Sequence, residues 1–358
     1  MRKGFAFCIG LILLALSITA CGSAEKSEEQ PVVVETETPE PLVTPPAEEQ
    51  KEPAEPVKPE EPLKDEYSLP FEGMRPMAVM IDNEGTRVLP QGGLDKAQIV
   101  YEVIVEGGLT RLMPVFWGTE PEMIGPVRSA RHYFLDFSME YDAIYVHYGG
   151  SPQAGADIKK LKQDEIDGMY LGPDVFWDLT KDKGNWQDSY TSMEKLKKHA
   201  EKKKFHNTAE VKFPFTYNKA GEDVVPAGDN AAAVTLKYPS MTSKYEYDSS
   251  SGTYKRFRYG KEHMERVSGK QMTAKNIIVL YVTSWDIKGD YAGRQDMDTT
   301  GSGSGYYITC GKAVKLKWSK ESRSSQTKYT LENGDPLVLN RGQTWIQIMP
   351  VGAKVTIE

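Results

Sequence analysis

One long segment of this chain cannot fold by itself. Residues 22–68 hold nine prolines, fourteen acidic residues and four lysines, with no aromatic residue before Tyr67. Such a segment cannot bury enough apolar surface to offset its loss of conformational entropy. We therefore predict a disordered, Pro-rich acidic stalk over residues 21–68, so that any packed core must come from the remainder of the 358 residues.

The stalk also accounts for the acidity of the chain. Its formal charge is −10, residues 1–20 contribute +2, and the whole chain carries −7, which leaves +1 for residues 69–358. A body this close to neutral gives no electrostatic reason for a nucleic-acid partner, and we expect none. A Pro-rich spacer could reach about 150 Å at most, at ~3.1 Å per residue, which would hold the body well away from a membrane.

Residues 1–20 have the features of a lipoprotein signal peptide. Two basic residues precede an apolar run, residues 5–16, that is too short for a stable membrane-spanning helix. The run leads into Ile18-Thr19-Ala20-Cys21, in which an aliphatic residue and two small ones precede Cys, as in sites of lipoprotein signal peptidase. We predict cleavage before Cys21 and lipidation of its thiol. A secretory peptide that contains Cys by chance, or an uncleaved anchor helix, is the alternative.

A lipidated Cys21 would determine the location and the thiol chemistry of the protein. The lipid bilayer is then a partner, and the body is exposed at the outer face of the cytoplasmic membrane. Cleavage removes Cys8, so Cys310 is left without a disulfide partner and is expected to be a small core residue. The five histidines are scattered and form no zinc pattern, and we expect neither a metal nor a cofactor.

The remainder of the chain changes character near residue 221. Before it, apolar runs typical of strands alternate with helical patterns. The strands are predicted at residues 77–81, 98–105, 112–117 and 143–148, and the helices at 129–139, 154–161 and 191–204. After it, strand-like runs separated by turns dominate. We predict an α/β (α+β) N-terminal domain, residues 69–220, followed by a mainly β C-terminal domain, residues 228–358.

Several blocks of sequence resemble one known family. They are residues 77–83, 94–97, 101–111, 125–131 and 142–152 in the first half, and 298–303 and 342–346 in the second. These blocks resemble the YerB-like family of bacterial envelope lipoproteins, and the similarity covers nearly all of residues 70–354. The resemblance implies a two-domain lipoprotein of unassigned biochemical function, so it supplies no catalytic residues.

Two arginines at a predicted helix start form the first candidate site. The Gly-Pro pair at 125–126 predicts a helix whose first turn carries Arg128 and Arg131 on one face. The helix dipole disfavours cations there, and a bound phosphate or carboxylate would offset that cost. The alternative is an internal ion pair with an acidic residue, for which the candidates are Glu102, Glu106 and Asp136.

Glu102, Glu106 and Arg111 are further candidates for ligand binding. At strand spacing the two glutamates point to the same side about 13 Å apart, at ~3.3 Å per residue. That separation is too large for the carboxylate pair of a glycosidase within one strand. Glu106 is also expected to form a structural pair with Arg111.

His147 and Ser151 form the last candidate site. A strand ending at His147 is followed by two glycines, Ser151 and Pro152, a pattern that predicts a helix start able to bind an anion. Catalysis by Ser151 with His147 as base would require the two side chains to meet in space, and the chain has no Gly-x-Ser-x-Gly turn. A capping serine and a hydrogen-bonded histidine are the non-catalytic alternative.

These patterns favour a non-catalytic binding or scaffold module of the cell envelope. Its ligand would be an anionic wall polymer or the ectodomain of a membrane enzyme, bound near the arginines and His147. The alternative is a wall-directed hydrolase or transferase that uses His147 with Ser151 or an acidic residue. A purely structural partner of another envelope protein is a third possibility. The lysine-rich stretch 195–204 is interpreted as a solvated helix face or as a contact with anionic lipid or polymer.

Overall fold

The computed structural model describes residues 67, 69–70, 73–180 and 188–358. All of them belong to one compact unit that spans Glu60–Glu358. The predicted signal peptide, the lipidation site at Cys21 and the predicted stalk up to residue 66 lie outside the described residues. Among the residues described, no helix is both long enough and apolar enough to cross a bilayer.

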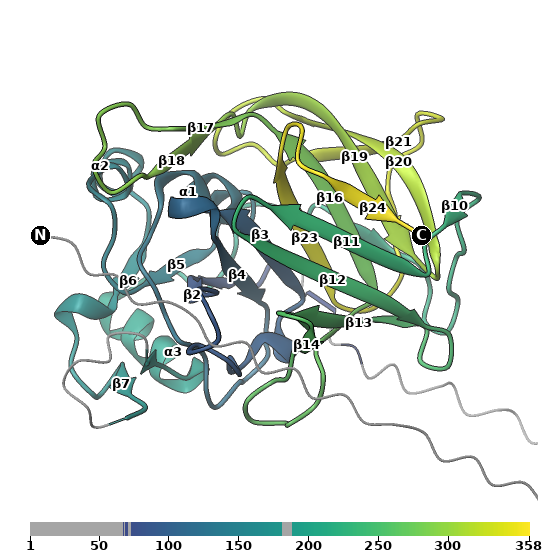
Figure 1. The fold of residues 1–358 in the computed structure, drawn as a ribbon. Coiled ribbons are helices and arrows are strands. Elements are labelled where there is room, and N and C mark those ends of the chain that lie inside the picture. Colours follow the sequence, from purple (N-terminus) through teal and green to yellow (C-terminus); the bar gives the residue numbers. More distant parts are fainter. Residues whose placement is uncertain (1–66, 68, 71–72, 181–187) are drawn as a thin grey trace, which may run out of the picture. The chain divides into compact units, whose positions relative to one another are not determined.

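Strands and helices alternate in the first half of this unit (Figure 1). Its helices are α1 (His132–Met139), α2 (Pro152–Leu161) and α3 (Met193–Lys203), and its 3-10 turns are η1 (Leu94–Lys96), η2 (Glu106–Gly108) and η3 (Gly168–Tyr170). Its strands are β1 (Met77–Val79), β2 (Ile81–Asp82), β3 (Ile99–Ile104), β4 (Thr110–Phe116), β5 (Ile144–His147), β6 (Glu165–Asp167), β7 (Trp177–Asp178) and β8 (Ser189–Tyr190). The predicted strands of this half are therefore present, with the first of them divided into β1 and β2.

Local sequence signals determine where α2 and α3 begin. Ser151 is the N-cap of α2, where its hydroxyl accepts a hydrogen bond from the backbone N–H of Ala154 at 3.1 Å, and Pro152 follows in the first turn. Ser192 is the N-cap of α3, and its hydroxyl accepts from the N–H of Lys195 at 3.3 Å. Both helices were predicted from these capping patterns, to within two residues.

Helix α1 begins later than predicted. The helix expected from Ser129 starts at His132, so Arg128 does not lie in its first turn and this part of the prediction was wrong. The backbone N–H of Arg128 donates to the carbonyl of Met80 at 2.9 Å, and its own carbonyl accepts from the residue after β5. A backbone paired in this way on both sides is extended and cannot also form a helical turn. Arg131 is the N-cap, with an extended ψ of 143°.

In the second half, the described residues form strands and turns without helices. The strands are β9 (Thr216–Tyr217), β10 (Asp229–Asn230), β11 (Ala233–Tyr238), β12 (Met241–Asp248), β13 (Thr253–Arg258), β14 (Lys261–Glu262), β15 (Thr273–Ala274), β16 (Asn276–Val282), β17 (Ser284–Asp286), β18 (Gln295–Met297), β19 (Gly301–Thr309), β20 (Lys312–Lys320), β21 (Lys328–Leu331), β22 (Val338–Leu339), β23 (Thr344–Pro350) and β24 (Val355–Ile357). The predicted fold class, an α/β first half followed by a mainly β second half, is confirmed.

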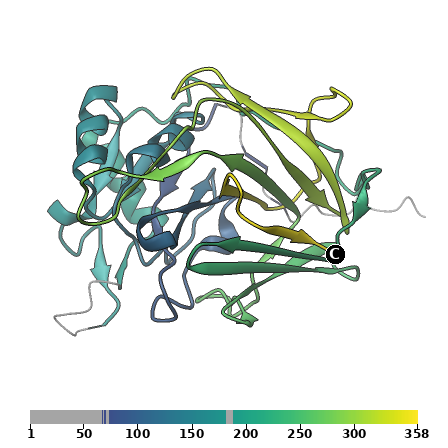
Figure 2. The same ribbon diagram turned by 45° about the horizontal axis from the view of Figure 1, so that its top comes forward.

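One sheet of twelve strands joins the two halves. Its order is β10-β20-β19-β16-β23-β3-β4-β1-β5-β6, with β2 paired to β4 and β21 to β20. Strand β23, near the C-terminus, lies parallel to both of its neighbours, β16 and β3, and places Gln347 opposite Glu102. The three helices gather on one side of the unit and the C-terminal strands on the other (Figures 1 and 2).

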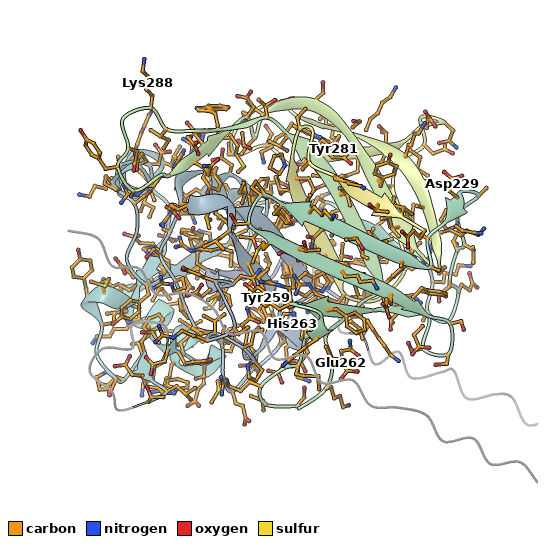
Figure 3. All side chains as sticks on the ribbon, in the orientation of Figure 1. Asp229, Tyr259, Glu262, His263, Tyr281 and Lys288 are labelled. Carbon is orange, nitrogen blue, oxygen red and sulfur yellow. The ribbon has the colours of Figure 1, made fainter. Side chains whose placement is uncertain are left out.

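A second sheet covers the middle of the first. Its six strands have the order β14-β13-β12-β11-β24, with β15 on β13. Its inner face meets β23, since the Arg256 guanidinium of β13 lies 4.4 Å from the ring centre of the buried Trp345. Separately, β17 and β18 pair as a hairpin, and the loop between them carries Lys288, which projects away from the body (Figure 3).

Candidate functional site

Three of the predicted arginines come together around two carboxylates. Arg128 Nε lies 2.8 Å from Asp82 Oδ2. Arg131 Nε forms a short ion pair with Glu106, and Arg111 Nη2 lies 3.9 Å from the same carboxylate. We call Arg111, Arg128 and Arg131 the arginine cluster. The predicted alternative of an internal ion pair therefore holds for Glu106, and Asp82 is a partner that the sequence did not suggest.

The arginine cluster lies beside the ends of two parallel strands. The segment that carries Arg128 and Arg131 takes its backbone partners from Met80, just after β1, and from Tyr148, just after β5. Arg111 comes from β4 and donates from Nη1 to a carbonyl of this segment at 2.8 Å. In open α/β sheets, the carboxyl ends of parallel strands are the usual edge for ligand binding.

Burial and mutual repulsion perturb these arginines. Burial lowers the pKa of Arg111 to about 10, and the positive charge of Arg131 contributes to the shift. Burial also lowers the pKa of Arg128, although Asp82 opposes the shift. Burial disfavours the ionised form of Glu106, but the hydrogen bond and charge of Arg131 outweigh it, so its pKa is lowered. Three guanidinium groups thus share two carboxylates within a site that is partly desolvated.

The β17–β18 hairpin supplies a fourth arginine at the rim. Arg294 Nε lies 4.0 Å from Glu106, and its Nη1 lies 2.9 Å from Asp290 of the same hairpin. The side chains of Arg294 and Glu106 are 27% and 21% exposed, whereas that of Arg131 is 9% exposed. The exposed Glu84 also acts on Arg128 through its charge. Water therefore reaches the cluster mainly at Glu106 and Arg294.

His147 has both ring nitrogens engaged. Its Nδ1 lies 2.9 Å from the carbonyl oxygen of Gly149, to which it donates, and its Nε2 lies 2.8 Å from Glu165 Oε2. Asp167 Oδ1 lies 3.7 Å from His147 Nδ1 and accepts a hydrogen bond from the backbone N–H of Gly149 at 2.7 Å. The side chain of His147 is only 3% exposed. This buried imidazole holds the glycine turn after β5, and both of its nitrogens face groups of the protein and not an open site.

Ser151 serves as a helix cap. Its hydroxyl accepts from the N–H of Ala154, the residue is 3% exposed, and within the described residues no hydrogen bond joins it to His147. The capping role that the sequence predicted is therefore present, and the geometry of a Ser–His pair is not.

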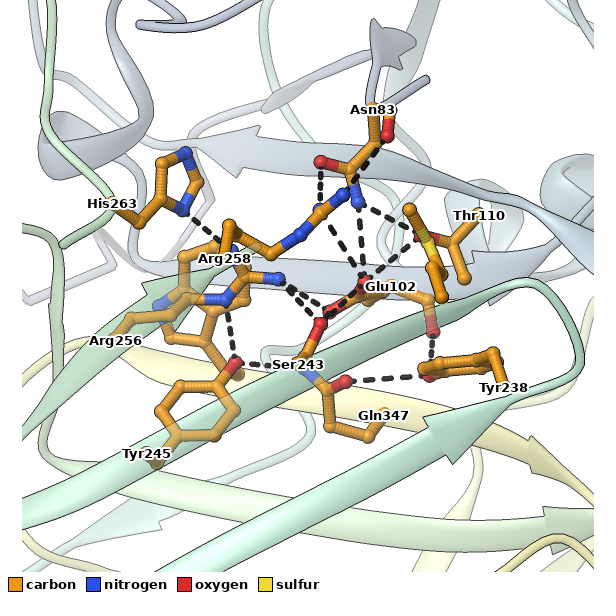
Figure 4. A network of polar contacts seen from close by, with 12 residues as sticks. Asn83, Glu102, Thr110, Tyr238, Ser243, Tyr245, Arg256, Arg258, His263 and Gln347 are labelled. Carbon is orange, nitrogen blue, oxygen red and sulfur yellow. Dashed lines mark hydrogen bonds and ion pairs between the residues drawn. The ribbon is translucent and has the colours of Figure 1, made fainter. Parts of the chain in front are cut away.

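Glu102 lies away from the arginine cluster, inside a closed polar network (Figure 4). The carboxylate lies 2.6 Å from Arg256 Nη2 and accepts from the hydroxyl of Ser243 at 3.0 Å. It also accepts from Thr110 at 2.9 Å and from the side-chain amide of Asn83 at 3.1 Å. Its exposure is 0%, so the predicted pairing of Glu102 with Arg128 or Arg131 and its role as an open ligand-binding residue are both incompatible with this position.

The rest of the network connects the two halves of the chain. Arg256 Nη1 donates to His263 Nδ1, so the neutral ring donates from Nε2 to Gln91 Oε1 at 2.5 Å. Burial and the charges of Arg256 and Arg258 hold the pKa of His263 well below its usual range. Arg258 in turn contacts both the side chain and the carbonyl of Asn83. Glu102, Arg256, Arg258 and His263 are each at most 1% exposed, which is the geometry of a structural clamp.

Sequence reasoning missed Arg256, Arg258 and His263. A signal was present, because Tyr254, Arg256 and Arg258 occupy alternate positions of one strand and therefore share a face. In a sequence, a strand face that carries two arginines is normally interpreted as solvent-exposed, but this face points inward. Only the position of Glu102 on β3 shows that this face is buried.

The candidate residues do not converge on one cavity. Among the described residues, four cavities of about 460 to 860 Å³ open at the surface, and none of the seven predicted binding residues lines any of these four. The arginine cluster, the His147 turn and the Glu102 network are thus separate features, of which only the arginine cluster combines excess positive charge with partial exposure.

Known proteins share both halves of this chain. Residues 66–206 match the family model described as "Protein of unknown function (DUF3048) N-terminal domain", and residues 234–346 match its C-terminal counterpart. A protein of Bacillus subtilis (strain 168) named "Putative lipoprotein YerB" is 32% identical over 281 residues, which cover 77% of this chain and 81% of that protein. A crystal structure of YerB protein from Bacillus subtilis superposes with a TM-score of 0.69 at 30% identity, covering 79% of this chain and 94% of that chain. The predicted resemblance is confirmed, and the chain belongs to the YerB-like DUF3048 family, whose function is unknown.

Proposed function

We propose that this protein is a lipid-anchored, non-catalytic binding module of the cell envelope, and that the arginine cluster binds an anionic group. Cys21 would carry the lipid, and the acidic stalk would hold the body away from the outer face of the cytoplasmic membrane. The name of the Bacillus subtilis relative supports a lipoprotein. The wall polymers and membrane-enzyme ectodomains of this compartment are the partners we propose.

The observation that carries the proposal is the charge balance of the cluster. Arg111 and Arg131 share the single carboxylate of Glu106, and Arg128 pairs with Asp82. A phosphate or carboxylate at the rim would add negative charge beside the guanidinium groups and accept bidentate hydrogen bonds from them. Burial lowers the pKa of Arg111, and the nearby positive charge of Arg131 acts in the same direction.

The geometry of the other candidates favours binding over catalysis. His147 and Ser151 are both committed to internal hydrogen bonds, and the carboxylate of Glu102 is closed off from water. A hydrolase or transferase needs a base within reach of a substrate proton, and these three side chains do not offer one. No contact of the described residues favours the alternative of a wall-directed hydrolase.

Anion binding by the chain from residue 22 onward tests the proposal. Isothermal titration with a soluble glycerol-phosphate polymer should give binding that weakens as salt rises. Arg128→Ala combined with Arg131→Ala should abolish it. Lys159→Ala with Lys160→Ala is the matched control, because it removes the same charge from exposed positions of α2 and should leave binding intact.

A folding control separates loss of binding from loss of structure. Removing two partly buried arginines takes Arg128 away from Asp82 and leaves Glu106 with only its longer contacts to Arg111 and Arg294, so a measurement of folding must accompany the double variant. Arg294→Ala changes only the rim, and its side chain is 27% exposed, so it should fold and bind several-fold more weakly. Unchanged binding by a folded double variant would refute the proposal.

A further inference from the structure

An apolar pocket lies at the opposite edge of the same parallel strands. Its volume is about 460 Å³, within the range of about 300 to 1,000 Å³ typical of small-molecule sites. Its apolar lining includes Met74, Met77, Phe116, Ile144, Met193 and Phe205. Met77 and Ile144 are the first residues of β1 and β5, whereas the arginine cluster lies beyond their last residues. The pocket and the cluster are therefore different sites.

The wall of this pocket is mainly apolar, and its apolar part is adaptable. Three methionines line it, and their unbranched thioether side chains change conformation easily to fill irregular space. Met77 and Met193 are buried, but Met74 is 37% exposed and stands at the mouth. Phe116 and Phe205 complete the apolar lining. A wall of this kind accepts a flexible hydrocarbon chain better than it accepts a rigid polar ligand.

The charged groups of the pocket leave one cation available to a ligand. Arg75 is neutralised internally, with Asp164 at 2.6 Å and Asp142 at 3.2 Å. Lys197 pairs with Glu120, but both side chains are about half exposed, at 43% and 57%, so water and ligands can exchange with this pair. Glu201, the carboxylate in the lining, is one helical turn from Lys197.

Helix α3 adds a wider positive field around the mouth. Six lysines against Glu194 and Glu201 give residues 193–204 a formal charge of +4. Burial and the nearby charges of Lys203 and Lys202 lower the pKa of His199, which is consistent with that field. An anionic group is therefore favoured beside α3, next to an apolar pocket.

We propose that this pocket binds the acyl chain of an anionic single-chain lipid, with the head group held at Lys197 and the positive face of α3. The combination of a hydrocarbon-lined pocket with a cationic mouth is the chemistry that recognises an anionic amphiphile. This inference does not depend on the arginine cluster, because it rests on different residues at a different edge of the sheet.

Titration with single-chain lipids tests the inference. The chain from residue 22 onward contains the whole compact unit Glu60–Glu358 and carries no lipid of its own. Lysophosphatidylglycerols of increasing chain length, each kept below its critical micelle concentration, should bind with one-to-one stoichiometry. The affinity should rise roughly fourfold for each added methylene until the pocket is full. An affinity that does not change with chain length would overturn the proposal.

Two matched pairs of variants locate the site. Met74→Glu places a carboxylate at the exposed mouth and should weaken binding by roughly tenfold or more, whereas Met169→Glu, at a methionine that is 58% exposed elsewhere, should have no effect. Lys197→Ala should weaken lysophosphatidylglycerol but not zwitterionic lysophosphatidylcholine, and Lys159→Ala, which removes an exposed lysine of α2 instead, serves as its control. Wild-type affinity in a folded Met74→Glu variant would place the lipid elsewhere and refute the assignment. The Arg128→Ala and Arg131→Ala variant, if folded, should bind these lipids normally.

Discussion

Replacing Glu102 by Gln should destabilise the fold strongly. The side chains of Glu102 and Arg256 are both 0% exposed, and they meet at 2.6 Å. Glutamine keeps the shape of the side chain but removes the negative charge, so Arg256 is left buried without a counter-ion. Breaking a buried pair from one side costs about 3–5 kcal/mol, and Arg258, 3.9 Å from the same carboxylate, places the expected loss toward the upper part of that range.

Urea unfolding followed by tryptophan fluorescence measures this loss. The indole of Trp345 lies 4.4 Å from the Arg256 guanidinium and reports directly on the network. Glu246→Gln is the matched control, because Glu246 pairs with Lys244 at the surface and both side chains are 45% exposed. Surface pairs of this kind contribute about 0–1 kcal/mol, so the control should unfold close to the wild type.

The comparison of the two variants decides whether the reasoning is correct. If Glu102→Gln unfolds at the same urea concentration as Glu246→Gln, the network is not a clamp and the argument fails. Replacing both Glu102 and Arg256 by Met should recover part of the loss, because Arg256 is then no longer buried without a counter-ion. The recovery should stay incomplete, because Arg258 still loses the same carboxylate. If the losses of stability in Glu102→Met and Arg256→Met simply add up in the double variant, the two residues are not directly coupled.

The remaining predictions concern acid stability and anchoring. Burial disfavours the ionised form of Glu102, but the charges of Arg256 and Arg258 outweigh it and lower its pKa. The stabilisation from the ionised Glu102 carboxylate is therefore complete above the ordinary pKa of 4.5 and is lost as the pH falls through the lowered pKa. The urea midpoint of the wild type should decrease below pH 4.5. The midpoint of Glu102→Gln should decrease less over the same pH range. Labelled palmitate should be incorporated into the wild-type chain and not into Cys21→Ala; equal labelling of both would exclude Cys21 as the lipidation site.

Much of the local structure could be predicted because its causes are local. The capping hydroxyl of Ser151 and the proline that follows it act within one turn, and the start of α2 was predicted from them. The alternation of apolar runs and helical patterns likewise indicated the fold class. The failure at Arg128 has a long-range cause, since its backbone partners come from the residues after β1 and β5, which no local pattern identifies.

The candidate site was predicted less well than the fold, for the same reason. Arg128, Arg131, Arg111 and Glu106 do come together, but Glu102 is only four residues from Glu106 and lies in a different environment. Strand β3 ends at Ile104, and the turn η2 that follows redirects the chain. Spacing along a strand predicts which residues share a face only while the strand continues.

The position of Glu102 also bears on how the two halves of the chain depend on each other. Strand β23 pairs with β3 along Thr344 to Ile348. Strand β13 supplies Arg256, which forms an ion pair with the Glu102 carboxylate of β3. Without the second half, β3 would therefore have an unpaired edge, and Glu102 would lose both Arg256 and the residues that cover it. The change in sequence character near residue 221 marks a change in fold class, whereas the hydrogen bonds and the ion pair cross it. The two family models describe two parts of one sheet, so the arginine cluster in the first half is held in place by strands from both.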